Sequence, residues 1–149
     1  MNNLFRLSLT VALVGALWGL AMPVIAVQKA TLTVKFTGLR NDKGEAQITL
    51  YPDEKSWDKE KHSHVVSGPI KGGTATVTLR DLPPGTYGVA ALHDENRNGD
   101  MDTRFGIPRE GVGLSNNPKL SFTSSPGWKD IKLDCPAGEK TIEIKAKYF

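Results

Sequence analysis

The chain has 149 residues and almost no cysteine, since Cys135 is the only one. A single cysteine forms no internal disulfide, so a hydrophobic core must hold the domain together. Aromatic residues are scarce at 7%, and 19 Lys+Arg nearly balance 16 Asp+Glu. The lysines are scattered without interleaved aromatics, which argues against nucleic acid as a partner. We expect Cys135 to be a buried thiol near a strand end rather than a link between two copies.

Long apolar runs are absent except near the N-terminus, between Leu7 and Leu20. The run is followed by Val24-Ile25-Ala26, which has small residues where a signal peptidase requires them. We therefore predict a secretory signal peptide over residues 1–26. A membrane anchor is the alternative, but the run is shorter than the roughly 20 apolar residues that a span needs. The predicted mature domain, residues 27–149, is periplasmic or secreted and has no membrane span.

Long helical periodicity is also missing, and alternation of apolar and polar residues takes its place. Six or seven short strands separated by turn signals predict an all-β fold. We expect an antiparallel β-sandwich of about seven strands, immunoglobulin-like or prealbumin-like. One helical turn is expected within residues 52–62. The predicted strands are residues 30–37, 46–51, 74–79, 86–92, 130–134 and 141–148. The predicted core is Leu32, Val34, Phe36, Ile48, Leu50, Val77, Leu79, Val89, Ile142 and Ile144.

The most informative segment present is residues 93–102, in which oxygen-bearing side chains alternate around Gly99. Ca²⁺ takes six to eight oxygen ligands, and such a loop can supply them. The first half matches an EF-hand loop, but the glutamate expected at its twelfth position is replaced by Phe105. We therefore predict a Ca²⁺ site that is not an EF-hand. Its predicted ligands are Asp94, Asn96, Asn98, Asp100 and Asp102.

A metal-free turn is the competing interpretation of the same loop. Asn98-Gly99 is a strong hairpin signal, and Asp and Asn side chains can cap their own turns. The acids would repel one another unless a cation or the nearby arginines offset them.

The glycine-rich segment that follows, residues 105–120, interrupts the strand pattern. We expect a long connection, which in a compact domain is usually functional or disordered. Its apolar residues Ile107, Val112 and Leu114 indicate that it packs on the sandwich. It could supply further oxygens near the acidic loop from Glu110, Ser115, Asn116 and Asn117.

An ordered series of motifs runs through the chain: Leu82-Pro83-Pro84-Gly85-Thr86-Tyr87, His93-Asp94-Glu95-Asn96, Asn98-Gly99, Asp102, Gly106-Ile107-Pro108, Glu110-Gly111 and Gly113-Leu114-Ser115-Asn116-Asn117. This series resembles the bacterial exported family DUF2141. The resemblance covers nearly all of residues 27–149. It implies export and a sandwich related to carboxypeptidase regulatory domains, and it implies no established activity.

Two other pairs of residues are candidates for a chemical site. His93 and Ser115 would make a hydrolase, but Ser115 lacks the glycine two residues later that a nucleophile elbow has. His62 and His64 could share a transition metal, although no third ligand is apparent and a solvated loop fits better.

Trp57 and Trp128 could stack on sugars, but such residues more often cover the ends of a sandwich core. The sequence thus favours a non-enzymatic domain that binds Ca²⁺ and acts in binding or structural support at the cell envelope. The predicted partner is an envelope protein or glycan. A carbohydrate- or peptide-binding accessory module and a hydrolase remain as alternatives.

Overall fold

Two packed β-sheets form the described part of the chain, which in this computed structural model is residues 28–121 and 126–149. The predicted signal peptide lies outside the described residues. The elements are β1 (Ala30–Thr37), β2 (Glu45–Tyr51), α1 (Glu54–Asp58), β3 (His64–Gly68), β4 (Ile70–Lys71), β5 (Thr74–Leu82), β6 (Gly85–Asp94), β7 (Thr103–Arg104), β8 (Ile107–Pro108), β9 (Gly111–Leu114), α2 (Trp128–Ile131), β10 (Lys132–Cys135) and β11 (Gly138–Lys145).

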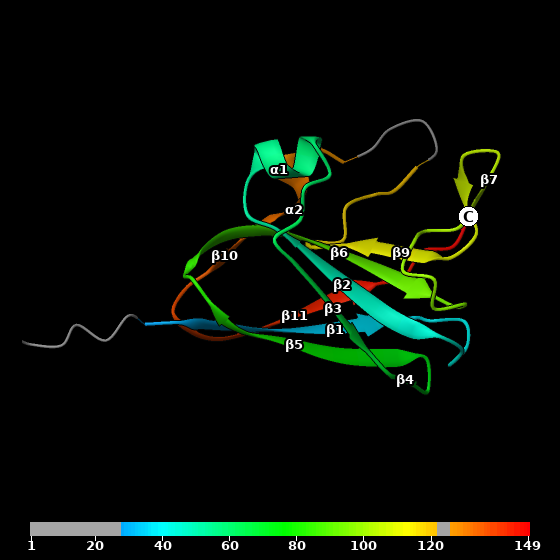
Figure 1. Cartoon of the computed structure of the whole chain (residues 1–149), viewed down its shortest axis with the longest axis horizontal. Helices are drawn as coiled ribbons and strands as arrows, with labels where there is room; N and C mark the ends of the chain where they lie inside the picture. The colour runs from blue at the N-terminus through cyan, green and yellow to red at the C-terminus, as the bar shows by residue number, and fades with distance from the viewer. Residues whose placement is uncertain (1–27, 122–125) are drawn as a thin grey trace, which may run out of the picture.

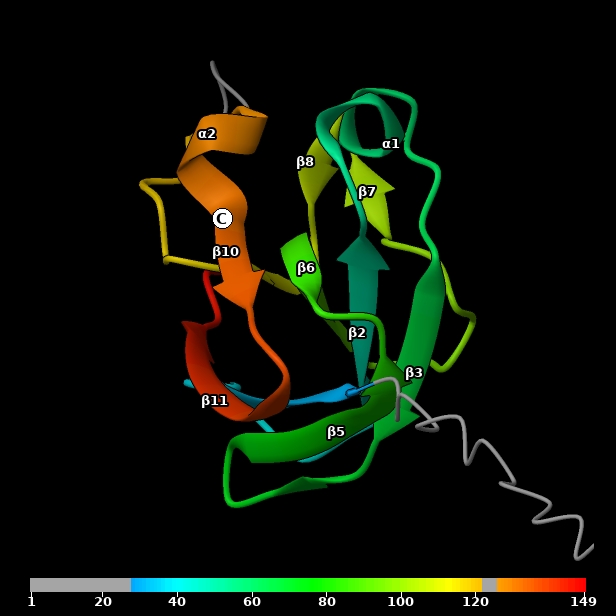
Figure 2. The same ribbon diagram turned by 90° about the vertical axis from the view of Figure 1, so that its left-hand side faces the viewer.

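The two sheets lie as separate layers, as Figure 2 shows. One sheet has the strand order β11-β1-β5-β4, and the other has β10-β6-β2-β3 with β9 also paired to β6. A small third sheet is the β7–β8 hairpin. The all-β sandwich predicted from the alternating pattern is therefore confirmed.

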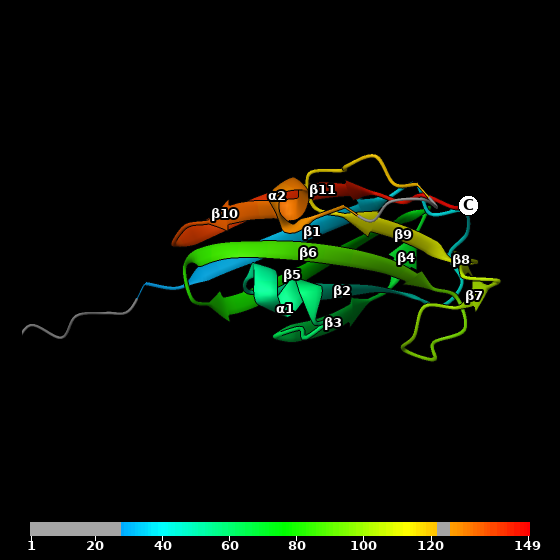
Figure 3. The same cartoon turned by 90° about the horizontal axis from the view of Figure 1, so that it is seen from above.

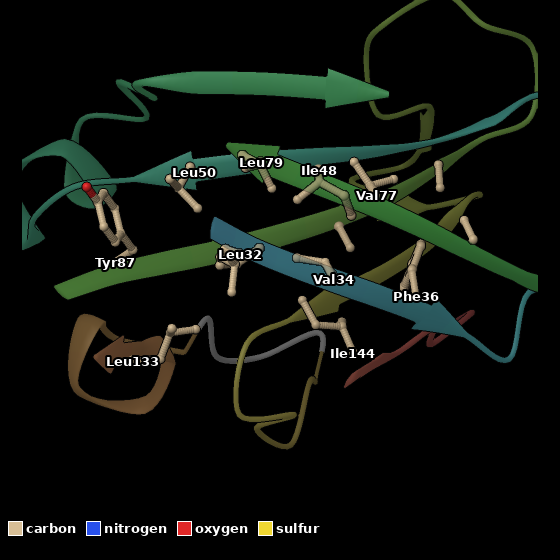
Figure 4. Packing of buried hydrophobic residues seen from close by; sticks show 14 of the residues in the cluster. Leu32, Val34, Phe36, Ile48, Leu50, Val77, Leu79, Tyr87, Leu133 and Ile144 are labelled. Carbon is tan, nitrogen blue, oxygen red and sulfur yellow. The ribbon is translucent and has the colours of Figure 1, made fainter. Parts of the chain in front are cut away.

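The core lies between the two layers, and Figure 4 shows its side chains meeting there. Nine of the ten predicted core residues are buried, and Ile142 is partly buried against the same cluster. Alternate residues of β1 and β2 are buried, which is the period-two pattern that the sequence displays. Cys135 is buried at the end of β10, as expected.

One pair of strands departs from the predicted antiparallel arrangement. β11 pairs with β1 in parallel register, with Val34 opposite Ile142. The chain crosses from β10 in one sheet to β11 in the other, so no hairpin forces these strands to run in opposite directions. The sandwich is thus mixed rather than purely antiparallel.

The glycine-rich segment contains a strand that the sequence pattern did not predict. Its β9 pairs antiparallel with β6, and both Gly111 and Gly113 are buried. A Cβ atom on Gly111 would lie 2.5 Å from Tyr148, and one on Gly113 would lie 2.5 Å from Ile144. The glycines are therefore the reason that β9 can approach β11 closely, not a sign of a loop.

The two helices are short and lie near the same end of the five-stranded sheet, where Tyr51 of β2 pairs with Gly88 of β6. α1 begins at Asp53, whose side chain accepts the backbone N–H of Ser56, and it contains Trp57 as predicted. In α2, Trp128 packs over Gly88, where a Cβ atom would lie 2.9 Å from its ring. Among the described residues, no helix is long and apolar enough to cross a membrane.

Candidate functional site

The acidic loop follows β6 directly. The last two residues of that strand, His93 and Asp94, are buried. Asp94 accepts the backbone N–H of Asn98 at 3.2 Å and that of Gly99 at 2.8 Å. The loop is therefore wound around the carboxylate of its first residue. Gly44 makes room for this, since a Cβ atom there would lie 1.9 Å from the carbonyl oxygen of Asp94.

Two asparagines continue the winding and point at one carboxylate. The side-chain oxygen of Asn96 accepts the N–H of Asn98 at 3.0 Å, and that of Asn98 accepts the N–H of Asp100 at 2.8 Å. Their amide nitrogens donate to Asp102, at 2.8 Å from Asn96 and 3.1 Å from Asn98. Four of the five predicted ligands thus form one hydrogen-bonded unit.

Glu110 closes the loop from the far side of the β7–β8 hairpin. Its Oε1 accepts the N–H of Glu95 at 2.8 Å, and its Oε2 accepts the N–H of Asp102 at 3.0 Å. Only 3% of Glu110 is exposed. The prediction that Glu110 brings oxygens close to this loop is confirmed.

The other predicted contributors from the glycine-rich segment lie elsewhere. The Asn116 amide donates to the carbonyls of Asp130 and Lys132, and Asn117 is hydrogen-bonded to β11. That part of the prediction is wrong, because these asparagines fix the chain between β9 and β11.

Asp100 also stands apart from the other four predicted ligands. Its backbone N–H joins the network, but no hydrogen bond links its side chain to Asp94, Asn96, Asn98 or Asp102 among the described residues. Asp100 instead lines a groove on the outer sheet face.

The donor set combines carboxylate and amide oxygens, which are the hard ligands that Ca²⁺ takes. None of the ion pairs formed by the described residues includes Asp94, Asp102 or Glu110. No group of three or more His, Cys, Asp or Glu side chains in the described ranges is arranged to hold a metal ion. A cation would therefore need the asparagine oxygens as well, and the two amides would have to turn their nitrogens away from Asp102.

Glu95, within this loop, has a perturbed pKa. Its carboxylate lies 2.5 Å from Arg40 and also accepts from Asn41 at 3.3 Å. Burial acts to raise the pKa of Glu95, but the hydrogen bonds from Asn41 and Arg40 and the charge of Arg40 outweigh it, so that the pKa is lowered. Arg40 lies far away in sequence, and no motif marked it.

His93 and Ser115, the residues of the hydrolase alternative, have structural partners instead. His93 is hydrogen-bonded to the Tyr148 hydroxyl at 2.6 Å and to the Lys43 carbonyl at 2.8 Å. Ser115 is fully buried, accepts the N–H of Val89 at 3.0 Å and donates to the carbonyl of Ile131. Ser115 is bonded beside Val89, which lies four residues before His93 on β6, a distance of roughly 13 Å along the strand. The side chains of His93 and Ser115 therefore do not meet.

A groove of about 860 Å³ lies on the outer face of the five-stranded sheet. Residues of β2, β6 and β9 form its floor, α1 contributes one wall and the acidic loop contributes the other. Tyr51 and Trp57 meet there edge to face, with ring planes at 89°. They do not form the flat pair of rings on which a sugar would stack. His62 also lines the groove, whereas exposed His64 begins β3 and bonds to Ser63.

The fold and the loop together define a class: a small β-sandwich domain whose longest strand ends in a self-capped, carboxylate-rich loop. The model of the family described as "Uncharacterized protein conserved in bacteria (DUF2141)" matches residues 34–143, and the chain belongs to this family. The resemblance seen in the sequence is thereby confirmed. No curated protein and no solved structure matches the chain.

Proposed function

We propose that this protein is an exported, non-enzymatic domain that binds Ca²⁺ through the loop from Asp94 to Asp102 and acts in binding or structural support at the cell envelope. The proposed ligands are Asp94, Asn96, Asn98, Asp102 and Glu110. The observation that carries the proposal is the burial of Asp94 and Glu110 beside Asp102, with none of the three in an ion pair among the described residues. Gathering like charges out of water is costly, and a bound cation offsets that cost.

Thermal melting in EDTA, in Ca²⁺ and in Mg²⁺ tests the proposal. Extracellular calcium modules bind at about 10⁻⁴–10⁻³ M, so about 10 mM Ca²⁺ is a saturating test. A tenfold excess over the dissociation constant stabilises the folded state by about 1.4 kcal/mol, which raises the Tm by roughly 4–8 °C. Mg²⁺ should do less, because it demands tighter octahedral geometry. Identical melting of the wild-type protein in EDTA and in Ca²⁺ would refute the metal proposal.

The loop offers its own matched control. Asp102→Asn and Asp100→Asn each remove one negative charge, but of these two side chains only that of Asp102 is hydrogen-bonded to the amides of Asn96 and Asn98. We expect Asp102→Asn to abolish the Ca²⁺-induced shift and Asp100→Asn to retain most of it. Equal loss in both variants would indicate general attraction of cations to an acidic loop. Equilibrium dialysis with Ca²⁺ gives the stoichiometry independently of stability.

Export is tested by mass spectrometry of the protein recovered from outside the cytoplasm. The proposed cleavage follows Ala26, so the recovered chain should begin at Val27. A recovered chain that retains Leu7–Leu20 would replace the signal peptide with an anchor.

A second candidate function is binding of a short peptide in the outer groove, in place of a glycan. The groove supports it because its volume is in the range of ligand pockets and its floor contains Leu92, Val112 and Leu114. The perpendicular rings of Tyr51 and Trp57 weigh against a sugar. Titrating a library of short peptides against the wild-type protein and Leu92→Lys tests it: binding that Leu92→Lys leaves unchanged lies elsewhere.

A further inference from the structure

The β7–β8 hairpin holds an aromatic side chain almost entirely in solvent. Phe105 is 91% exposed, and the hairpin also exposes Ile107 (39%). Met101 (47%) just before the hairpin and Phe149 (37%) are exposed as well. Figures 1 and 3 place the hairpin at the same end of the molecule as the C-terminus. Apart from Val65, the exposed large apolar residues among those described therefore belong to this end.

The backbone of Phe105 is as unfavourable as its exposure. Pairing of Arg104 with Ile107 leaves a two-residue turn, in which Phe105 has φ 54° and Gly106 has φ 77°. Turns with two positive φ values favour Asn-Gly, because a bulky side chain is strained in the left-handed region. Among the described residues, the Phe105 ring has an aromatic or cation–π contact only with the Arg104 guanidinium, at 5.4 Å. This exposed contact offsets little of the two costs, and strained backbone of this kind clusters at functional sites.

Three arginines line a hollow beside this aromatic side chain. The hollow, of about 360 Å³, is lined by Arg40, Arg104 and Arg109 together with Phe105, Ile107, Pro108 and Phe149. The charged side chains in this lining are all guanidinium groups, although Arg40 is also bound to Glu95. Guanidinium groups recognise phosphate through paired hydrogen bonds, and the adjoining rings offer apolar surface.

We propose that the β7–β8 hairpin docks the protein on an anionic phospholipid surface. Phe105 enters the boundary between headgroups and acyl chains, and Arg104 and Arg109 face the lipid phosphates. An aromatic ring at the tip of a two-stranded hairpin can enter a fluid surface without a shaped pocket, whereas a stable protein partner needs about 800 Å² of matched surface on each side. Basic side chains next to the apolar tip complement the negative charge of the leaflet.

Vesicle flotation in EDTA tests the docking independently of the proposed Ca²⁺ site. The probes are vesicles of phosphatidylcholine alone and of phosphatidylcholine mixed with phosphatidylglycerol. The wild-type protein should float with the mixed vesicles and much less with phosphatidylcholine alone. Arg104→Gln should weaken binding to the mixed vesicles about fivefold, in line with the attraction of one basic residue to an anionic leaflet. Arg80→Gln, an exposed arginine on β5, is the matched control and should leave binding unchanged.

Phe105→Asn separates docking from folding. Asparagine tolerates the left-handed backbone, so the variant should melt a few degrees higher than the wild-type protein. Its binding to mixed vesicles should fall about tenfold or more, because the variant lacks the ring that enters the lipid surface. Val65→Asn, at the exposed valine of β3, should bind like the wild-type protein.

Three results would overturn the proposal. The first is a wild-type protein that does not float with mixed vesicles, which leaves the exposed ring to a protein partner. The second is unchanged flotation of Phe105→Asn. The third is release from the vesicles by millimolar glycerol 3-phosphate, which would assign the arginines to a soluble phosphate.

Discussion

The carboxylate of Glu110 accepts the backbone N–H of Asp102 at 3.0 Å, across the β7–β8 hairpin. Its other oxygen accepts the N–H of Glu95, so one buried side chain joins both ends of the acidic loop. Glu110→Ala leaves two donors without partners, and we expect a loss of about 2–4 kcal/mol in the free energy of unfolding. Urea denaturation measures it. Glu139→Ala, at an exposed glutamate, should change the stability by less than about 0.5 kcal/mol.

The lowered pKa of Glu95 makes its contribution to stability depend on pH. A folded-state pKa below that of the unfolded chain, about 4.3, stabilises the fold above that pH, and the effect is lost as the pH falls through the folded-state pKa. Glu95→Gln should therefore cost about 1 kcal/mol near neutral pH, a small value because Arg40 is half exposed.

The loss caused by Glu95→Gln should be smaller at acidic pH than at neutral pH, because the carboxylate becomes protonated in both states as the pH falls below the lowered folded-state pKa. Urea titrations at the two pH values measure the difference. A loss that is the same at both would mean that the glutamine perturbs packing rather than charge.

Tyr148 and His93 form a second buried polar link, between the end of β6 and the chain after β11. Burial raises the pKa of Tyr148, so its hydroxyl stays protonated and can donate to the ring nitrogen of His93. The same hydroxyl accepts the N–H of Arg40 at 3.1 Å. Tyr148→Phe should cost about 1–3 kcal/mol, because it leaves a buried nitrogen without its partner. The hydroxyl of Tyr51 forms no hydrogen bond to another residue of the described ranges, so Tyr51→Phe should be nearly neutral in the same denaturation experiment.

Local pattern predicted the long alternating strands well, but it missed β3 and the short strands, and it predicted the long-range features poorly. Leu32, Val34 and Phe36 alternate with polar residues, and that period alone assigns them to the core. By contrast, β9 became a strand because its glycines fit against Tyr148 and Ile144, and no local signal encodes those partners. The parallel pairing of β1 with β11 likewise depends on how the chain crosses between sheets.

The acidic loop follows the same division. The spacing of oxygen-bearing residues predicted one cluster that contains Asp94, Asn96, Asn98 and Asp102. This succeeded because the hydrogen bonds of this cluster connect residues that are close in sequence. Asp100 shared that spacing, but its side chain lies on the groove side. The Arg40–Glu95 pair joins residues that only the fold brings together.

The predicted core can be tested at two of its members on neighbouring strands. Val34 and Ile144 are fully buried in the cluster between the sheets. Truncating a large aliphatic side chain in such a core costs about 2–5 kcal/mol for isoleucine, and less for the smaller valine. Ile144→Ala and Val34→Ala should therefore lower the midpoint of urea denaturation clearly. Lys35→Ala, at the exposed residue between core positions of β1, should not. Equal effects at positions 34 and 35 would contradict the assigned face of β1.

The single cysteine gives a probe of local opening. Cys135 is fully buried, and burial raises the pKa of its thiol. Thiolate is the reactive form, so both inaccessibility and the raised pKa should suppress its reaction with a disulfide reagent in the folded protein. We expect labelling at least about a hundredfold slower than in urea-unfolded protein, where the thiol returns to its ordinary pKa of about 8.5. Labelling at the unfolded rate in the native protein would place Cys135 outside the core and contradict its position at the end of β10.

The raised pKa of the folded-state thiol also makes stability depend on pH. The free energy of unfolding should fall at alkaline pH, because the thiol of the unfolded chain ionises at a lower pH than that of the folded protein.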